Sequence, residues 1–247
     1  RMTELDRQAV ILSQLSYLPL KQIEEPLKAQ GFCNVTVIQS EETDTEAFAC
    51  ESEEAIFLCF RGTEMTEWED LKTDAEFIKT KPVDKKYRIH TGFFEAWQSV
   101  AAEVGAEILE RKLEELAYAE AFGLLEKPIV YCGHSLGGAL ATIAAATHQP
   151  GYLITFGCPR VGGRKFAKHL NESSTEIRRW AYGSDIVSLI PNLGYRHAGN
   201  EFHINRDTGE IELGINPIVR WFRMVFAPRV LTDHRIGNYV KALGGAD

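Results

Sequence analysis

The chain has 247 residues, a formal net charge of −8, and 45% hydrophobic against 25% charged residues. This is the composition of an ordinary globular protein, and the length suffices for one large α/β domain with a sizeable core. An acidic chain lacks the basic face that phosphate groups require, so no nucleic-acid partner is expected. No uninterrupted apolar run approaches the roughly 20 residues needed to span a bilayer.

The five cysteines are scattered, and no two form a C-x-x-C pair: Cys33, Cys50, Cys59, Cys132 and Cys158. An odd, scattered set favours free thiols over a disulfide framework and argues against a zinc site. The chain opens without a charged and then apolar signal segment. These features favour a cytoplasmic location over a secreted one, and no metal ion is expected.

The first sixty residues are expected to form two helices and then strands. Apolar residues at helical spacing predict helices over 3–18 and 20–30. Residues 32–40 are predicted to form a strand, and the chain returns after an acidic turn through 47–50. Residues 55–60 form an almost continuous apolar run, which indicates a strand buried on both faces of a central sheet.

The segment 64–78 has an amphipathic pattern, in which Met65, Trp68 and Leu71 recur at helical spacing among acidic residues. It predicts a short helix beside the end of the 55–60 strand. Two interpretations remain open, namely a lid over a site at that strand end, or a surface helix whose Trp68 packs inward.

Strands and helices alternate through the middle of the chain. The predicted order is a polar loop at 79–86, a short strand at 87–90, a helix from 92 to about 120, strands at 129–132, 152–157 and 176–182, and a helix at 164–171. The long helix is expected to pack through one apolar stripe: Phe93, Trp97, Val100, Val104, Ile108 and Leu116. This alternation implies a mostly parallel sheet with helices on both faces, in a single domain over 1–247.

Residues 128–138, PIVYCGHSLGG, join a β-prone run, a G-x-S-x-G sequence and a helical apolar pattern. Strand, sharp turn and helix around Ser135 is the context in which this motif denotes a nucleophile elbow. Glycines suit the turn because strand and helix pass close to each other. The helix N-terminus offers N–H groups beside Ser135, and the N–H of Leu136 is expected to stabilise an oxyanion.

A serine hydroxyl needs a base to take its proton, and the base must be oriented by a third group. In folds with such an elbow, an acid and then a histidine follow the serine. Asp185, at the end of a strand, is the expected acid. Asp207 is interpreted as a turn former and Asp233 as a helix-start residue. His234, which opens the last helix, is the expected base.

Three other histidines receive structural interpretations. His197 and His203 are expected to be structural, and His134 to pack or form hydrogen bonds beside the elbow. Thr63 lies in the loop after the 55–60 strand, where both its N–H and its hydroxyl are able to serve an oxyanion hole. A plain strand-ending turn at Thr63 remains the alternative.

The last third is predicted to contain an apolar loop, two small antiparallel strands and a final helix: 186–191, 195–205 with 210–213, and 232–243. Between them, residues 217–231 are rich in large apolar side chains with interspersed arginines. This segment covers the sheet edge or contacts lipid, and both interpretations remain open.

The chain resembles the class 3 (fungal-type) lipases in several motifs that occur in the same order. They are Phe60-Arg61-Gly62-Thr63, Trp68 with Asp70, His90-Thr91-Gly92-Phe93, 133–138, Thr155-Phe156-Gly157-Cys158-Pro159-Arg160-Val161-Gly162, Asp185-Ile186-Val187, and Asp233-His234 with Tyr239. The resemblance implies an α/β-hydrolase fold with Ser135 as nucleophile, Asp185 as acid and His234 as base. It also implies an oxyanion hole of Thr63 and Leu136, and a lid over residues 64–75. This lid is unusually charged.

The function expected is a serine carboxylic-ester hydrolase, foremost a lipase that cleaves acylglycerols through an acyl-enzyme intermediate without a cofactor. An esterase or phospholipase of the same fold, or a non-catalytic lipid-binding relative, remains the alternative. The expected partners are a lipid or other ester substrate and transient contact with a lipid interface, while the oligomeric state stays open.

Overall fold

The computed structural model describes residues 1–62, 87–191, 194–214 and 232–244. Its main sheet has eight strands in the order β1 (Cys33–Ser40), β2 (Thr45–Glu51), β3 (Ile56–Phe60), β4 (Ile129–His134), β5 (Tyr152–Phe156), β7 (Glu176–Tyr182), β9 (Asn200–Ile204) and β10 (Ile211–Leu213). Strands β3, β4, β5, β7 and β9 are parallel, whereas β1, β2 and β10 pair antiparallel at the edges. The predicted, mostly parallel sheet is confirmed.

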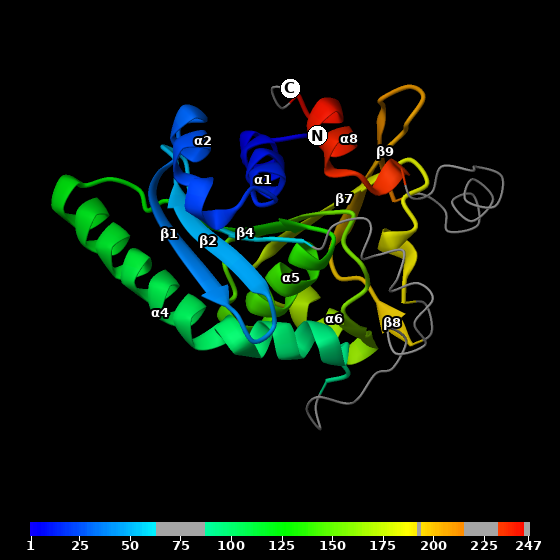
Figure 1. The fold of residues 1–247 in the computed structure, drawn as a ribbon, viewed down its shortest axis with the longest axis horizontal. Helices are drawn as coiled ribbons and strands as arrows, with labels where there is room; N and C mark the ends of the chain where they lie inside the picture. Colours follow the sequence, from blue (N-terminus) through cyan, green and yellow to red (C-terminus); the bar gives the residue numbers. More distant parts are fainter. Residues whose placement is uncertain (63–86, 192–193, 215–231, 245–247) are drawn as a thin grey trace.

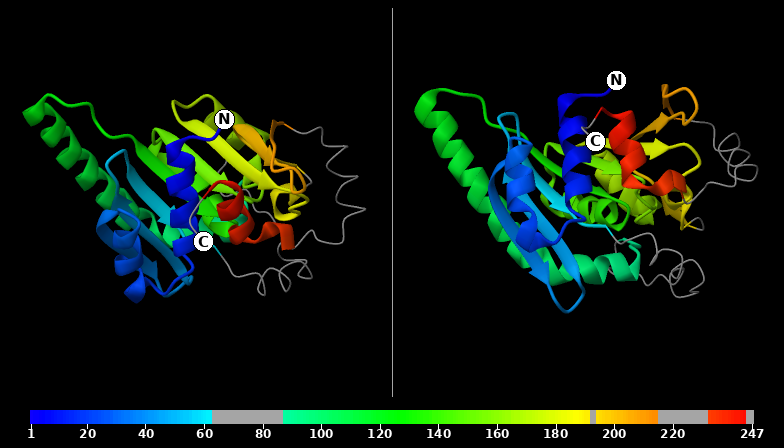
Figure 2. Two further views of the ribbon diagram at one scale, coloured as in Figure 1. Left: turned by 90° about the horizontal axis from the view of Figure 1, so that it is seen from above. Right: turned by 45° about the horizontal axis from the view of Figure 1, so that its top comes forward.

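Helices cover both faces of this sheet, as predicted (Figures 1 and 2). One face carries α1 (Glu4–Leu15), α2 (Glu24–Ala29) and α8 (Ile236–Ala242), and the other carries α4 (Thr91–Phe122), α5 (Leu136–His148) and α6 (Arg164–Asn171). Among the described residues, no helix is both long and apolar enough to cross a membrane.

The central strands supply both hydrophobic cores, because their successive side chains point to opposite faces. In β3, Leu58 and Phe60 lie in the core under α4 and α5, whereas Phe57 and Cys59 lie in the core under α1 and α8. All five residues of β3 are buried. The continuous apolar run at 55–60 therefore reflects burial on both faces.

Helix α1 begins with a capping box in which Thr3 and Asp6 exchange hydrogen bonds. The buried carboxylate of Asp6 also accepts hydrogen bonds from Arg178, at 2.7 and 2.9 Å, and from the indole of Trp180, at 2.9 Å. These bonds fasten the first helix to β7. Burial alone would raise the pKa of Asp6, but the hydrogen bonds from Arg178, Thr3 and Trp180 outweigh it, and the pKa is lowered.

Helix α4 extends beyond the edge of the sheet (Figure 1). Phe93, Trp97, Val100, Val104 and Ile108 are buried, but Leu116 is 37% exposed, so the prediction for Leu116 is wrong. The buried stripe continues instead through Arg111, which donates to Glu107, Glu51, Thr36 and the carbonyl of Asn34. Leu116 lies in the C-terminal part of α4, where Leu113, Tyr118 and Phe122 are exposed as well.

Three further predictions need correction. Residues 87–90 form only an isolated bridge, between Ile89 and Gly162, because the antiparallel partner there is short. The predicted 195–205 strand divides into β8 (Tyr195–Arg196), which pairs with β6 (Gly162–Gly163), and β9, which runs parallel to β7. The final helix begins as a separate turn, η4 (Thr232–His234).

Within the described residues there are two other short helical turns. One is η1 (Leu20–Gln22), which together with α2 replaces the helix predicted over 20–30, and the other is η3 (Val187–Leu189) in the loop after β7. The predicted lid helix at 64–78, the loop at 79–86 and the apolar segment 217–231 lie outside the described residues.

Candidate active site

Ser135 lies at the sharp turn between β4 and α5, as the G-x-S-x-G motif predicts. Its backbone has φ 58° and ψ −126°, a strained conformation for a residue with a side chain. A Cβ on Gly133 would lie 2.4 Å from the backbone of Gly137, and one on Gly137 would lie 2.2 Å from the carbonyl oxygen of Phe60. The glycines therefore permit the close passage of strand and helix that the motif requires.

The structure brings Ser135, Asp185 and His234 together from three separate loops. Nε2 of His234 lies 2.8 Å from Oγ of Ser135, and Nδ1 lies 2.9 and 3.0 Å from the two carboxylate oxygens of Asp185. All three side chains are buried. Because an ionised carboxylate only accepts, Nδ1 carries the hydrogen, which leaves Nε2 to accept the hydrogen of the serine hydroxyl.

The carboxylate of Asp185 has two further donors, the N–H of Val187 at 2.9 Å and the hydroxyl of Tyr239 at 2.5 Å. Complete burial by itself would raise the pKa of Asp185. The charge of His234 and the hydrogen bonds from His234 and Tyr239 outweigh that effect, so the pKa is lowered. The acid is thus held ionised beside the imidazole.

Asp233 connects the turn that carries His234 to the loop that carries Asp185. Oδ2 of Asp233 accepts the N–H of Ser184 at 2.8 Å and lies 3.4 Å from Arg206. Its interpretation as a helix-start residue is therefore incomplete, since these two contacts join it to other loops. Sequence alone offers no signal for such a long-range contact.

His197 and His203 bind backbone carbonyls, in agreement with their structural interpretation. Nε2 of His197 lies 2.7 Å from the carbonyl oxygen of Ser188, and Nε2 of His203 lies 2.8 Å from that of Gly183. Both carbonyls flank Asp185, so these two histidines support the shape of its loop.

Leu136 is the first residue of α5 and precedes the first intrahelical bond, from the N–H of Ala139 to the carbonyl of Ser135. Its N–H is therefore one of those that an α-helix leaves without an intrahelical partner. The other predicted oxyanion residue, Thr63, and the predicted lid residues Met65, Trp68 and Leu71 lie outside the described residues.

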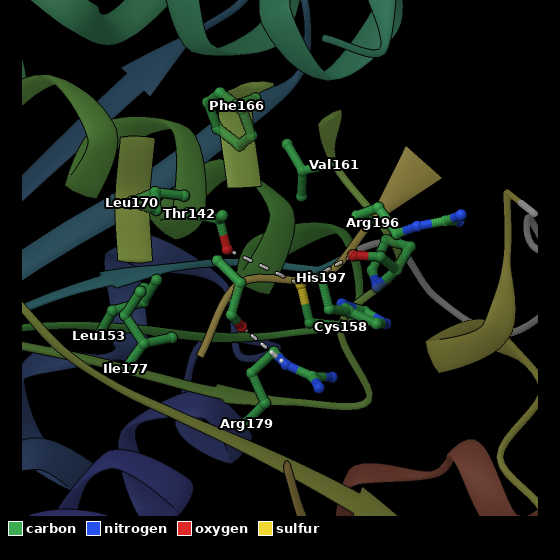
Figure 3. A pocket seen from close by; sticks show the side chains of 12 residues that line it. Thr142, Leu153, Cys158, Val161, Phe166, Leu170, Ile177, Arg179, Arg196 and His197 are labelled. Atoms are coloured by element: carbon green, nitrogen blue, oxygen red, sulfur yellow. Dashed lines mark hydrogen bonds between the residues drawn. The ribbon is translucent and has the colours of Figure 1, made fainter. Parts of the chain in front are cut away.

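A cavity of about 10 Å³ lies between α5, α6 and β7, and Figure 3 shows the hydroxyl of Thr142 directed at the sulfur of Cys158 inside it. This volume barely admits one water molecule, so the cavity is not a substrate site. In the part of the chain that the structure describes, no three His, Cys, Asp or Glu side chains are grouped to hold a metal ion. All five cysteines are free, and four of them are buried.

A sheet whose central strands are parallel, together with a nucleophile elbow and a buried Ser–His–Asp arrangement, defines an α/β-hydrolase. Residues 57–195, more than half of the chain, match the family model described as Lipase (class 3). The chain belongs to the class 3 lipase family.

Two curated relatives and one solved structure illustrate the similarity. A secreted mono- and diacylglycerol lipase 1 from Fusarium solani is 37% identical over 123 residues, which cover 47% of this chain and 34% of that protein. Secreted mono- and diacylglycerol lipase A from Penicillium cyclopium is 29% identical over 173 residues, which cover 66% and 52%. The triacylglyceride lipase of Rhizomucor miehei superposes with a TM-score of 0.74 at 21% identity, covering 94% of this chain and 92% of that chain.

The alignments span about a third to a half of the length of these curated relatives, and the structural likeness, at its low identity, establishes the fold. The expected cytoplasmic location is wrong. The Fusarium and Penicillium relatives are named as secreted proteins, and this finding overturns that expectation. Free cysteines do not indicate a reducing compartment here, because buried thiols are inert and a chain with a large core does not depend on disulfides.

Proposed function

We propose that this protein is a serine carboxylic-ester hydrolase, a lipase that cleaves acylglycerols through an acyl-enzyme intermediate. The observation that carries the proposal is the hydrogen-bonded series Ser135–His234–Asp185, with distances of 2.8 and 2.9 Å. The names of the relatives, which are lipases of mono-, di- and triacylglycerols, support acylglycerols as the substrate class.

In the proposed mechanism, Oγ of Ser135 attacks the ester carbonyl while Nε2 of His234 takes its proton. Asp185 stabilises the imidazolium that results. The negative oxygen of the tetrahedral intermediate is stabilised by the N–H of Leu136 and, as the sequence suggests, by Thr63. His234 then gives the proton to the leaving alcohol. A water molecule, deprotonated by the same histidine, releases the acid and restores Ser135.

Turnover of a chromogenic ester tests this proposal. Ser135→Ala is expected to lower kcat by at least about 10⁴-fold with the fold retained. Ser173→Ala is a matched control, because Oγ of Ser173 donates to a carbonyl at the end of α6, remote from the series. Equal turnover in the Ser135→Ala variant and the wild type would remove the proposal, as would a wild type without activity on every ester tested.

A series of esters of increasing chain length, measured below and above substrate aggregation, tests the assignment as a lipase. A rate increase on aggregation is expected for a lipase whose lid, proposed here to include Met65, Trp68 and Leu71, responds to a lipid interface. A preference for short, soluble esters without any increase would identify an esterase instead.

A further inference from the structure

His134, the residue before Ser135, contacts the turn that carries His234 in two ways. Its Nε2 lies 2.7 Å from the backbone carbonyl oxygen of His234, and the two rings stack at 4.6 Å between centroids with 29° between their planes. On its other side, Nδ1 of His134 lies 2.7 Å from the hydroxyl of Tyr17. His134 thus lies between the turn of His234 and the segment that follows helix α1.

The chemistry of these partners fixes the hydrogens. A backbone carbonyl only accepts, so Nε2 of His134 carries the hydrogen. Burial lowers the pKa of His134 to about 3, and the nearby charge of His234 adds to this effect. The ring is therefore neutral, Nδ1 is an acceptor, and Tyr17 is the donor. The hydroxyl of Tyr17 selects the one neutral form of His134 that donates to His234.

Tyr17 also lies against the loop that leaves β3. A Cβ on Gly62 would lie 2.3 Å from the hydroxyl oxygen of Tyr17 and 2.6 Å from the carbonyl oxygen of His134. The end of α1, the loop after β3 and the elbow therefore meet at this hydroxyl, and the turn of His234 lies on the other side of the His134 ring.

The turn that carries His234 is only three residues long, in η4, and lies outside the sheet. Contacts with other parts of the chain hold it from different directions: Asp233 accepts the N–H of Ser184 and lies 3.4 Å from Arg206, and the carbonyl of His234 accepts from His134. Loss of the hydrogen bond from His134 would remove the constraint on the backbone carbonyl of His234, while the contacts of Asp233 remain. A small displacement of Nε2 from Ser135 is enough to lower the rate, since proton transfer requires hydrogen-bond distance.

We propose that Tyr17 and His134 are positioning residues that hold the backbone of His234 so that Nε2 remains directed at Oγ of Ser135. This inference rests on the proposed function and deepens it. Neither residue takes part in proton transfer to the substrate, because the hydrogen bonds that hold them lead to the backbone of His234 and not to Oγ of Ser135.

The experiment compares Tyr17→Phe and His134→Phe with Tyr131→Phe in the full chain. Tyr131 is a matched control, because it is buried and its hydroxyl also lies 2.8 Å from Nδ1 of a histidine, His148. Tyr131 belongs to the same sheet, but this hydrogen bond does not involve Tyr17, His134 or His234. We expect kcat to fall about 10- to 100-fold in the two test variants with KM changed less than twofold. The Tyr131→Phe control is expected to retain kcat, even if its melting temperature falls by as much as those of the two test variants.

Rates are normalised to the number of intact sites, counted by titration with a phosphonate ester that reacts with Ser135, so that partial unfolding does not lower the apparent kcat. His134→Gln keeps an N–H donor and is expected to recover part of the loss seen in His134→Phe. A kcat per site equal to that of the control in both Phe variants would overturn the inference while leaving the proposed function intact. Absence of turnover in the wild type would instead remove the proposed function itself.

Discussion

Tyr239 donates its hydroxyl to Oδ2 of Asp185 at 2.5 Å, and the same hydroxyl oxygen accepts the backbone N–H of Tyr182 at 3.1 Å. Tyr239 belongs to α8, the helix that follows directly after the turn of His234. One helix therefore fixes the acid at the end of β7 and limits the position of the histidine that Asp185 orients. The distance between Asp185 and His234 therefore depends on the position of α8 relative to the sheet.

Tyr239→Phe is expected to lower kcat about tenfold, because Asp185 loses a charge-assisted hydrogen bond and is less firmly oriented. The N–H of Tyr182 also loses its acceptor, so we expect the free energy of unfolding to fall by about 2 kcal/mol. Steady-state kinetics and urea unfolding measure the two effects. Tyr182→Phe is the control, since its partly exposed ring packs 5.9 Å from that of Tyr239, and near wild-type values are expected for it. Wild-type kcat in Tyr239→Phe would contradict this role.

Asp185→Asn is expected to lower kcat by about 10⁴-fold while the protein remains folded. An amide is neutral and does not stabilise the imidazolium, and its NH₂ group favours the wrong tautomer of His234. The circular dichroism spectrum and the extent of unfolding in urea report on the fold. A loss of less than tenfold in kcat would show that Asp185 is not the orienting acid.

Gly157→Ala is expected to abolish most of the activity. Gly157 has φ +55°, and a Cβ there would lie 2.6 Å from Oδ2 of Asp185 and 2.9 Å from Nδ1 of His234. Gly123→Ala separates this contact from backbone strain, because Gly123 has φ +63° and an added methyl group there would meet open space. Both variants should lose stability, by about 1 kcal/mol from the unfavourable φ, but only Gly157→Ala should lose activity. Equal kcat in the two variants would contradict the prediction.

Asp6→Asn tests how the first helix is bound to the sheet. The folded pKa of Asp6 lies below its ordinary value, so its ionisation stabilises the folded state above about pH 4, and this stabilisation is lost as the pH falls through the folded pKa. We expect the variant to be about 3 kcal/mol less stable at pH 7, because Arg178 is left without its buried partner. Urea unfolding between pH 7 and about pH 2.5 should show this difference narrowing below about pH 4. A difference in the free energy of unfolding that stays constant with pH would show that the ionised carboxylate of Asp6 does not contribute to stability.

The sequence predicts those parts of the fold that are determined by residues adjacent to one another in the chain. Burial on both faces requires apolar residues at every position, so the strands at 56–60 and 152–156 are visible as runs. The strain at Ser135 requires glycines on both sides within a few residues. Asp185 and His234 follow because the order of such residues along the chain is restricted.

The contacts that sequence does not predict join distant residues that carry no local signal. Tyr17 and His134 are 117 positions apart, and a tyrosine after a helix end is unremarkable by itself. Ser184, one of the partners of Asp233, lies 49 positions earlier. Leu116 continues an apolar stripe at the correct spacing, yet its side chain is 37% exposed. Periodicity identifies the face of a helix, but the neighbouring element decides how far that face is buried.

The family match ends at residue 195 and begins at residue 57, whereas Tyr17 and His234 lie on opposite sides of it. A shortened polypeptide that keeps only the matched portion would retain a serine and an aspartate but would lack the imidazole between them. It would also lack the hydroxyl of Tyr17, which is proposed to hold the imidazole of His234 in position through His134. Any trimmed or permuted version of this protein therefore has to preserve both flanks, because the chemistry assigned to its centre is completed by its ends.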